Sequence, residues 1–233
     1  MLDIQRSDLV AGVAGSGTMG RGIVQVLAQC GVRTLVFDAQ PGAAAKAKEA
    51  IAKSLSAIAQ KGRITQADAD SALARIEIVD ALGALKPCHV VVEAIVELLA
   101  PKQELFKALE GIVSETCILA SNTSSLSVTA MASACAKPGR VAGYHFFNPV
   151  PVMKIVEVVD GELTEPWVGD ALVALAKRYG HKPVRCKDTP GFIVNHAGRG
   201  YVHESLRVLQ EGVADVATID RVLVDAAGFR LGP

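Results

Sequence analysis

The sequence predicts an α/β protein whose doubly wound, mostly parallel sheet carries antiparallel edge strands and is followed by an incomplete all-helical second domain. Two observations predict this fold class. From Asp8 onwards, short runs rich in β-branched residues alternate with longer runs rich in Ala, Lys and Glu, which is the pattern of βαβ units. Further along, a Pro-Gly pair at Pro190 and Gly191 separates this pattern from two additional helical stretches.

The predicted elements alternate between strand and helix up to Tyr144. The strands are short apolar runs: Leu9–Ala14, Thr34–Phe37, Ile76–Val79, Val90–Glu93, Ile118–Ser121 and Val141–Tyr144. The helices between them are longer and amphipathic: Thr18–Gln29, Gly42–Gln60, Pro101–Val113 and Val128–Cys135. After Tyr144 come a strand at 154–160, a helix at Glu165–Tyr179 and a strand at 182–186. These short connections predict antiparallel strands added to the sheet edge.

The chain is expected to divide into a first domain at residues 1–187 and a second at residues 188–233. The second contains only two predicted helices, Phe192–Gln210 and Ile219–Ala226. Two helices cannot close a core of their own. They are expected to pack on the first domain, on a partner chain or on residues beyond those given, so the second domain is predicted to be truncated.

Composition excludes several classes of protein. The 24 basic and 24 acidic residues cancel, which argues against a nucleic-acid-binding surface spread over the molecule but leaves room for a local basic pocket. The cysteines are odd in number and widely spaced, so they predict buried thiols in a reducing compartment and no metal or disulfide framework: Cys30, Cys88, Cys117, Cys135 and Cys186. No leader or membrane-spanning pattern is found, and a cytoplasmic protein is expected.

The strongest motif is Gly15-Ser-Gly17-Thr-Met-Gly20, which follows the first predicted strand and opens the first helix. This context is what a dinucleotide requires: Gly15 for a tight turn, Gly17 for close approach of a pyrophosphate, and Gly20 for packing of helix on strand. Asp38 lies 18 residues after Gly20, where a carboxylate binds ribose hydroxyls and repels a 2′-phosphate. The motif predicts a Rossmann-like domain that binds NAD in preference to NADP. The alternative is a glycine-rich turn with a capping Asp nearby.

Two polar groups follow the next strands at the same carboxyl edge. Glu93, Glu97 and Lys102 surround the end of the fourth strand, either as ligand contacts or as ordinary charges at a solvated helix start. Residues 121–125, Ser-Asn-Thr-Ser-Ser, end the fifth strand and are candidates for ligand contacts or for helix N-caps.

A catalytic pair is predicted from two late strands. His145 ends the sixth strand, and Glu157 lies twelve residues later in an otherwise apolar strand, where an acid must be paired or functional. If the strands are neighbours, Glu157 orients the imidazole through one nitrogen and leaves the other to abstract a proton. Asn195 falls one turn into the next helix, and His196 and His203 beyond it lack a third ligand, so no metal site is predicted.

Together these motifs resemble the 3-hydroxyacyl-CoA dehydrogenase family over essentially the whole chain: GSGTMGRGI, Asp38, VVEAIVE, SNTSS, HFFNPVPVMKIVE and TPGFIVN, in this order. The resemblance implies NAD-dependent oxidation of an (S)-3-hydroxyacyl-CoA to the 3-oxoacyl-CoA. It implies that His145 is the general base, Glu157 its partner, and Ser124 and Asn195 the groups that hold the substrate oxygen.

The resemblance also assigns ligand contacts. The implied NAD contacts are Gly15, Gly17, Thr18, Met19, Gly20, Asp38, Glu97, Lys102, Asn122, Ser124 and Asn148. The implied CoA contacts are Ser54, Lys61 and Ser124. Residues 1–187 would be the NAD-binding domain, and residues 188–233 the start of a substrate and dimerisation domain, so a homodimer is expected.

Placement within the family is a separate expectation. The final segment, EGVADVATIDRVLVDAAGFRLGP, resembles bacterial members that act on 3-hydroxyadipyl-CoA in phenylacetate degradation more than 3-hydroxybutyryl-CoA enzymes of fatty acid β-oxidation. Three alternatives stay open: a two-domain hydroxyacid dehydrogenase with a lysine base, a sugar-acid dehydrogenase that uses the same dyad without CoA, and an NAD-binding fragment without turnover.

Overall fold

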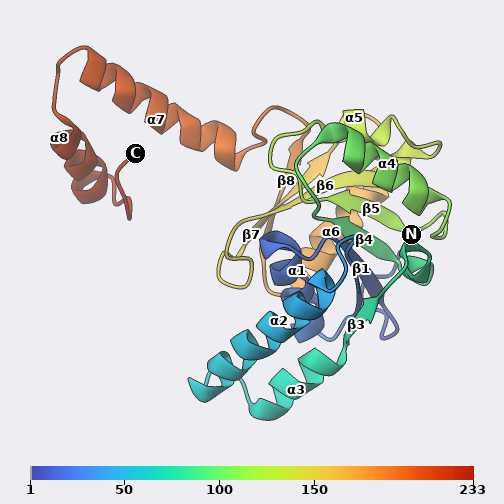
Figure 1. Cartoon of the computed structure of the whole chain (residues 1–233). Helices are drawn as coiled ribbons and strands as arrows, with labels where there is room; N and C mark the ends of the chain where they lie inside the picture. The colour runs from blue at the N-terminus through green and yellow to red at the C-terminus, as the bar shows by residue number, and fades with distance from the viewer. Residues whose placement is uncertain (1) are drawn as a thin grey trace. The chain divides into compact units, whose positions relative to one another are not determined.

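The computed structural model describes residues 2–233, which form two compact units (Figure 1). The first unit ends at Thr189 and the second spans Pro190–Pro233. All the strands and the helices α1 to α6 belong to the first unit, and α7 and α8 to the second.

The first unit is built on one eight-stranded sheet with the order β3-β2-β1-β4-β5-β6-β7-β8 among the described residues. The strands are β1 Val10–Ala14, β2 Arg33–Phe37, β3 Ile76–Val79, β4 Val90–Glu93, β5 Ile118–Ser121, β6 Val141–Phe146, β7 Ile155–Asp160 and β8 Lys182–Lys187. The strands from β3 to β6 are parallel, and β7 pairs antiparallel with β6. The predicted fold class is therefore confirmed.

Strands β7 and β8, at one side of the sheet, both run against the other six, as expected from the short connections. They nevertheless pair with each other in parallel. Helix α6 (Pro166–Arg178) lies between them in the chain and supplies the crossover that a parallel pair needs.

Helices cover both faces of the sheet (Figure 1). Helices α1 (Thr18–Gln29) and α6 share one apolar core with β1, β4 and β6, whereas α4 (Leu99–Glu110) and α5 (Val128–Ala132) pack against each other on the opposite face. Strands β1, β4, β5 and β6 are buried along their whole length, which is why they read as continuous apolar runs.

Helix α2 (Ala43–Gln60) is followed by α3 (Gln66–Ala74), which the sequence pattern did not predict. Helix α3 buries only Ala69 and Ala72, so its apolar periodicity is faint. Its start is marked by a capping box, in which Thr65 accepts from the Asp68 N–H and the Asp68 carboxylate accepts from the Thr65 N–H. That pattern is the signal that identifies the helix.

The cysteines of the described chain are all free thiols. Cys88, Cys117 and Cys135 are buried, and Cys30 and Cys186 are half-buried. Burial raises the pKa of Cys117 to about 12 and that of Cys135 to about 11, so neither thiol ionises at neutral pH. In residues 2–233 no cluster of His, Cys, Asp or Glu is arranged to hold a metal ion, and no helix is long and apolar enough to cross a membrane.

The second unit consists of α7 (Val194–Gln210), α8 (Val216–Arg221) and a short π-helical turn at Val222–Ala226. None of the residues in these three elements is buried. A groove of about 690 Å³ runs between the helices of this unit and is lined mainly by apolar side chains, among them Tyr201, Val208, Ile219 and Leu223.

Candidate active site

The glycine-rich turn joins β1 to α1, and its glycines are required for different reasons. Gly15 has φ +97°, and a Cβ there would lie 2.5 Å from the Ala94 carbonyl oxygen. A Cβ on Gly20 would lie 1.9 Å from the Gly15 carbonyl oxygen, so this glycine is needed by the turn itself and not mainly by the helix–strand packing expected from the sequence. A Cβ on Gly17 would meet no protein atom within 4 Å. The surface at Gly17 is open.

Asp38 follows β2 and holds this turn. Its Oδ2 accepts from the Ser16 N–H at 2.7 Å and from the Ser16 hydroxyl at 2.6 Å, and its Oδ1 accepts from the Gln40 N–H at 2.9 Å. Burial alone would raise the pKa of this carboxyl, but the hydrogen bonds outweigh burial and hold the pKa below its ordinary value. Ser16 had no distinguishing signal in the sequence.

A cleft of about 570 Å³ opens beside the turn. Its lining comes from the carboxyl ends of β1, β2 and β4 and includes Gly15, Gly17, Asp38, Gln40 and Ile95. This is the switch point of the sheet, where β1 is flanked by β2 and β4 and where doubly wound folds bind their ligands.

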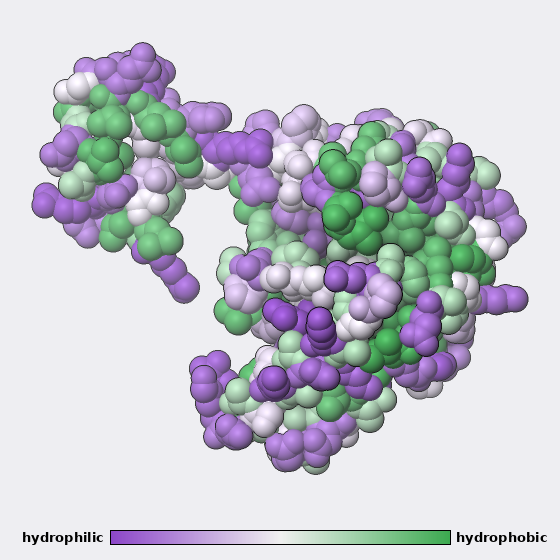
Figure 2. All heavy atoms as spheres, in the orientation of Figure 1, coloured by the Kyte–Doolittle hydropathy of each residue, from purple (hydrophilic) through white to green (hydrophobic). Residues whose placement is uncertain are grey.

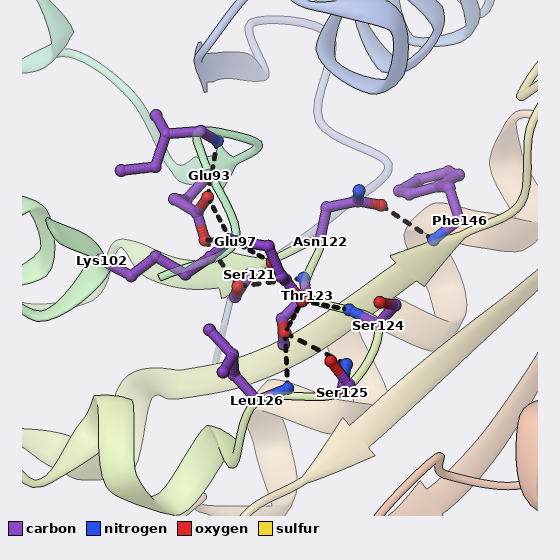
Figure 3. A network of polar contacts seen from close by, with 11 residues as sticks. Glu93, Glu97, Lys102, Ser121, Asn122, Thr123, Ser124, Ser125, Leu126 and Phe146 are labelled. Atoms are coloured by element: carbon purple, nitrogen blue, oxygen red, sulfur yellow. Dashed lines mark hydrogen bonds and ion pairs between the residues drawn. The ribbon is translucent and has the colours of Figure 1, made fainter. Parts of the chain in front are cut away.

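Glu93, Glu97 and Lys102 form one charged cluster (Figure 3). It lies beside the cleft, because residues 94–96, between the two glutamates, are part of the lining. The Lys102 Nζ donates to both Glu93 carboxylate oxygens, at 2.7 and 2.9 Å, and lies 3.0 Å from Glu97 Oε2. The side chains of Glu93 and Lys102 are 0% and 1% exposed, whereas Glu97 is 38% exposed. The interpretation of these charges as a solvated helix start is therefore wrong for Glu93 and Lys102.

Burial of the Glu97 carboxyl would raise its pKa. Hydrogen bonds from Thr123, Lys102 and the Ser124 N–H act against burial, and the net pKa is lowered. Glu97 is therefore an anion at neutral pH.

Residues 121–125 bond to the charged cluster and to β6, and none of them is the N-cap of α5 (Figure 3). The Ser121 hydroxyl donates to Glu93 Oε2 at 2.6 Å, and the Thr123 hydroxyl donates to Glu97 Oε1 at 2.5 Å. The Asn122 side-chain oxygen accepts from the Phe146 N–H at 3.0 Å, which ties the end of β5 to β6. Ser124 is half-buried, and its N–H donates to Glu97. The N-cap of α5 is Ser127, whose hydroxyl accepts from the Ala130 N–H.

His145 and Glu157 form the expected pair. The antiparallel register of β6 and β7 places the two residues directly opposite each other. His145 Nδ1 lies 2.6 Å from Glu157 Oε2, and the side chains are 7% and 0% exposed. A histidine bound to a buried carboxylate through one nitrogen is the arrangement of a general base and its orienting partner.

A second cleft, of about 670 Å³, lies over α1, α2 and the segment between β6 and β7. Ser54 and Lys61, which were predicted as CoA contacts, line it. Thr18 and Asn148, which were predicted as NAD contacts, line this second cleft as well and not the first. Three further cations line it and were not predicted: Arg21, Arg63 and Lys154. Its lining includes no acidic side chain, so this cleft is suited to a polyanion.

Thr18 and Met19 begin α1 directly beside Gly17. Asn195 belongs to the other unit, where it is the second residue of α7 and is half-buried.

Two family models match the chain. One, described as 3-hydroxyacyl-CoA dehydrogenase, NAD binding domain, matches residues 10–189, and the other, described as the C-terminal domain of the same family, matches residues 191–233. These two matches account for nearly all of the described chain.

Individual relatives agree with these matches. A 3-hydroxyadipyl-CoA dehydrogenase of Escherichia coli is 43% identical over 95% of this chain, and the human mitochondrial hydroxyacyl-coenzyme A dehydrogenase is 42% identical over 95%. The chain spans 46% of the length of the first, about half, and 72% of the second. The crystal structure of an (S)-3-hydroxybutyryl-CoA dehydrogenase from Ralstonia eutropha superposes with a TM-score of 0.93 at 38% identity, covering 96% of this chain and 79% of that one.

Proposed function

The chain belongs to the 3-hydroxyacyl-CoA dehydrogenase family, and we propose that it oxidises an (S)-3-hydroxyacyl-CoA to the 3-oxoacyl-CoA with NAD as the acceptor. The observation that carries the proposal is the buried His145–Glu157 pair, which lies at the carboxyl edge of the same sheet as the glycine-rich turn. A general base and a dinucleotide turn at one sheet edge are the two parts that this oxidation needs.

The residues of the first cleft fit NAD. The open surface at Gly17 leaves space for a pyrophosphate at the amino end of α1, and Asp38 is an anion held by Ser16 at the end of β2, where it favours ribose hydroxyls over a 2′-phosphate. Glu97, Lys102, Asn122, Ser124 and Asn148 would complete the contacts. NAD, when bound, supplies the hydride acceptor.

The chain's own residues move the proton. Because a carboxylate can only accept a hydrogen bond, we assign the proton between Glu157 and His145 to Nδ1, which leaves Nε2 to remove the proton from the C3 hydroxyl. The buried carboxylate also stabilises the imidazolium that forms. In the proposed reaction the Ser124 hydroxyl donates to the substrate oxygen as that oxygen becomes a carbonyl. The position of Asn195 in the TPGFIVN motif supports the same task for its side chain.

The second cleft supports a CoA thioester as substrate in preference to a free hydroxyacid or sugar acid. Its four cations lie where Ser54 and Lys61 were expected to meet CoA, whose phosphates are anionic. The 3-hydroxyadipyl-CoA dehydrogenase of Escherichia coli supports 3-hydroxyadipyl-CoA as the substrate. We propose with it a role in phenylacetate degradation. We also propose that the enzyme is cytoplasmic. A homodimer is supported by the apolar side chains that α7 and α8 leave exposed (Figure 2).

The proposed function is tested by NADH oxidation with 3-oxoacyl-CoA substrates of rising chain length, with and without an ω-carboxylate. Oxidation that depends on acetoacetyl-CoA is expected, and faster turnover of 3-oxoadipyl-CoA would support the phenylacetate assignment. Calorimetric binding of NADH without turnover of any 3-oxoacyl-CoA would instead identify a binding fragment.

Replacing Lys61 by alanine is expected to raise the KM for acetoacetyl-CoA about tenfold and leave kcat unchanged, because one phosphate contact is lost far from the reacting carbon. Steady-state kinetics are measured with acetoacetyl-CoA and with acetoacetyl-pantetheine, a truncated thioester that lacks the phosphates of CoA. Lys53→Ala is the matched control, since Lys53 is exposed on α2, the helix that ends just before Lys61, and does not line the cleft. An equal change with the truncated thioester would contradict a phosphate contact.

A further inference from the structure

Glu93 is a fully buried carboxylate that has no contact with substrate or cofactor in the proposed reaction. It is the last residue of β4, at the switch point of the sheet, and its side chain is 0% exposed. A buried charge is costly unless it is paired and hydrogen-bonded.

Donors from three segments meet on this one carboxylate (Figure 3). Lys102 of α4 donates to both oxygens, and the Ser121 hydroxyl at the end of β5 donates to Oε2. The Ile95 N–H, in the loop after β4, donates to Oε1 at 2.7 Å. These four contacts fill the lone-pair positions of a carboxylate, so the position and rotamer of Glu93 are fixed.

Two paths lead from Glu93 to Glu97, whose side chain is partly exposed. Through Lys102 it reaches Glu97, which lies 3.0 Å from the ammonium. Through Ser121 it reaches the turn that follows β5, because the Ser121 oxygen accepts from the Thr123 N–H at 3.1 Å and Thr123 in turn donates to Glu97. Both paths therefore converge on Glu97.

We propose that Glu93 is a positioning residue for the cofactor: it aims the Lys102 ammonium and, through it, the Glu97 carboxylate at the NAD site. This inference rests on the proposed function, in which Lys102 and Glu97 contact NAD. A buried ion pair adds little to stability compared with apolar side chains of similar volume. The role that the proposal gives the pair is to place a cation beside the cleft and next to Glu97, which apolar side chains cannot do.

The test is a double-mutant cycle read out as the Kd for NADH, in the full chain. E93Q keeps the size of the side chain and is expected to raise the Kd about tenfold, because Lys102 then keeps a carboxylate partner in Glu97 alone. In the K102M background the same substitution is expected to change the Kd less than about twofold, since the residue through which Glu93 acts is already absent. At saturating NAD, kcat of E93Q is expected to stay within about twofold of the unmodified chain.

Each outcome decides the inference. An unchanged Kd in E93Q, or a tenfold change that persists in the K102M background, overturns it. E110Q is the control, because Glu110 is a hydrogen-bonded carboxylate at the other end of α4. If E93Q does not fold, S121A provides the test, since it removes one donor from Glu93 without changing charge, and an unchanged Kd there overturns the inference. Failure of the unmodified chain to bind NADH would instead refute the proposed function.

Discussion

Replacing His145 by glutamine is expected to lower kcat by a factor of about 10³ and to leave the Kd for NADH within about twofold. Glutamine is close to histidine in size and can still hydrogen-bond to Glu157 across the β6–β7 pair, so the strand register is kept. Its amide cannot accept a proton at neutral pH. The substitution therefore slows proton removal from the C3 hydroxyl and leaves the binding of the cofactor unchanged.

Steady-state oxidation of an (S)-3-hydroxyacyl-CoA and a fluorescence titration with NADH separate the two effects. His89→Gln is the matched control, because His89 is also hydrogen-bonded, its Nδ1 accepting from the Val10 N–H at 3.0 Å, yet lies at the opposite end of the sheet. That variant is expected to retain kcat. A His145 variant with near-normal kcat would refute the assignment of the general base.

The sheet and the dyad were predictable from the sequence because both depend on local pattern. Strands buried on both faces must be continuous apolar runs, and an acid within such a run, as at Glu157, has to be paired. The short connection from β6 to β7 then implies the pairing that places Glu157 opposite His145. The parallel pairing of β8 with β7 was not predicted, although α6, between them in the chain, is long enough to be the crossover that a parallel pair needs.

Other features depend on contacts between distant segments and had no local signal. The spacing of Glu93, Glu97 and Lys102 is equally compatible with a solvated helix start, and only the packed sheet edge shows that Lys102 is buried. The cations of the second cleft lie far apart along the chain, from Arg21 to Lys154, and each alone resembles a surface charge. The burial of Lys102 and the meeting of distant cations at one cleft both depend on tertiary structure, so no local sequence pattern predicts them.

Gly17→Ala and Gly20→Ala are expected to fail in different ways, although both are glycine-to-alanine changes in one turn. A Cβ at position 17 meets no protein atom within 4 Å, and the residue has an ordinary φ of −61°. The free energy of unfolding of Gly17→Ala is therefore expected to stay within about 1 kcal/mol of the unmodified value. Its Kd for NADH is expected to rise about a hundredfold, because the added methyl occupies the space that the pyrophosphate needs.

Gly20→Ala, by contrast, places a Cβ 1.9 Å from the Gly15 carbonyl oxygen, so the turn itself must move. We expect destabilisation by about 3 kcal/mol together with loss of NADH binding. Chemical denaturation and NADH titration of both variants check the two expectations. Unchanged NADH affinity in Gly17→Ala would mean that no pyrophosphate approaches the open surface of the turn. The cofactor assignment would then fail even though the fold is intact, because a methyl group at position 17 can affect ligand binding without affecting the stability of the fold.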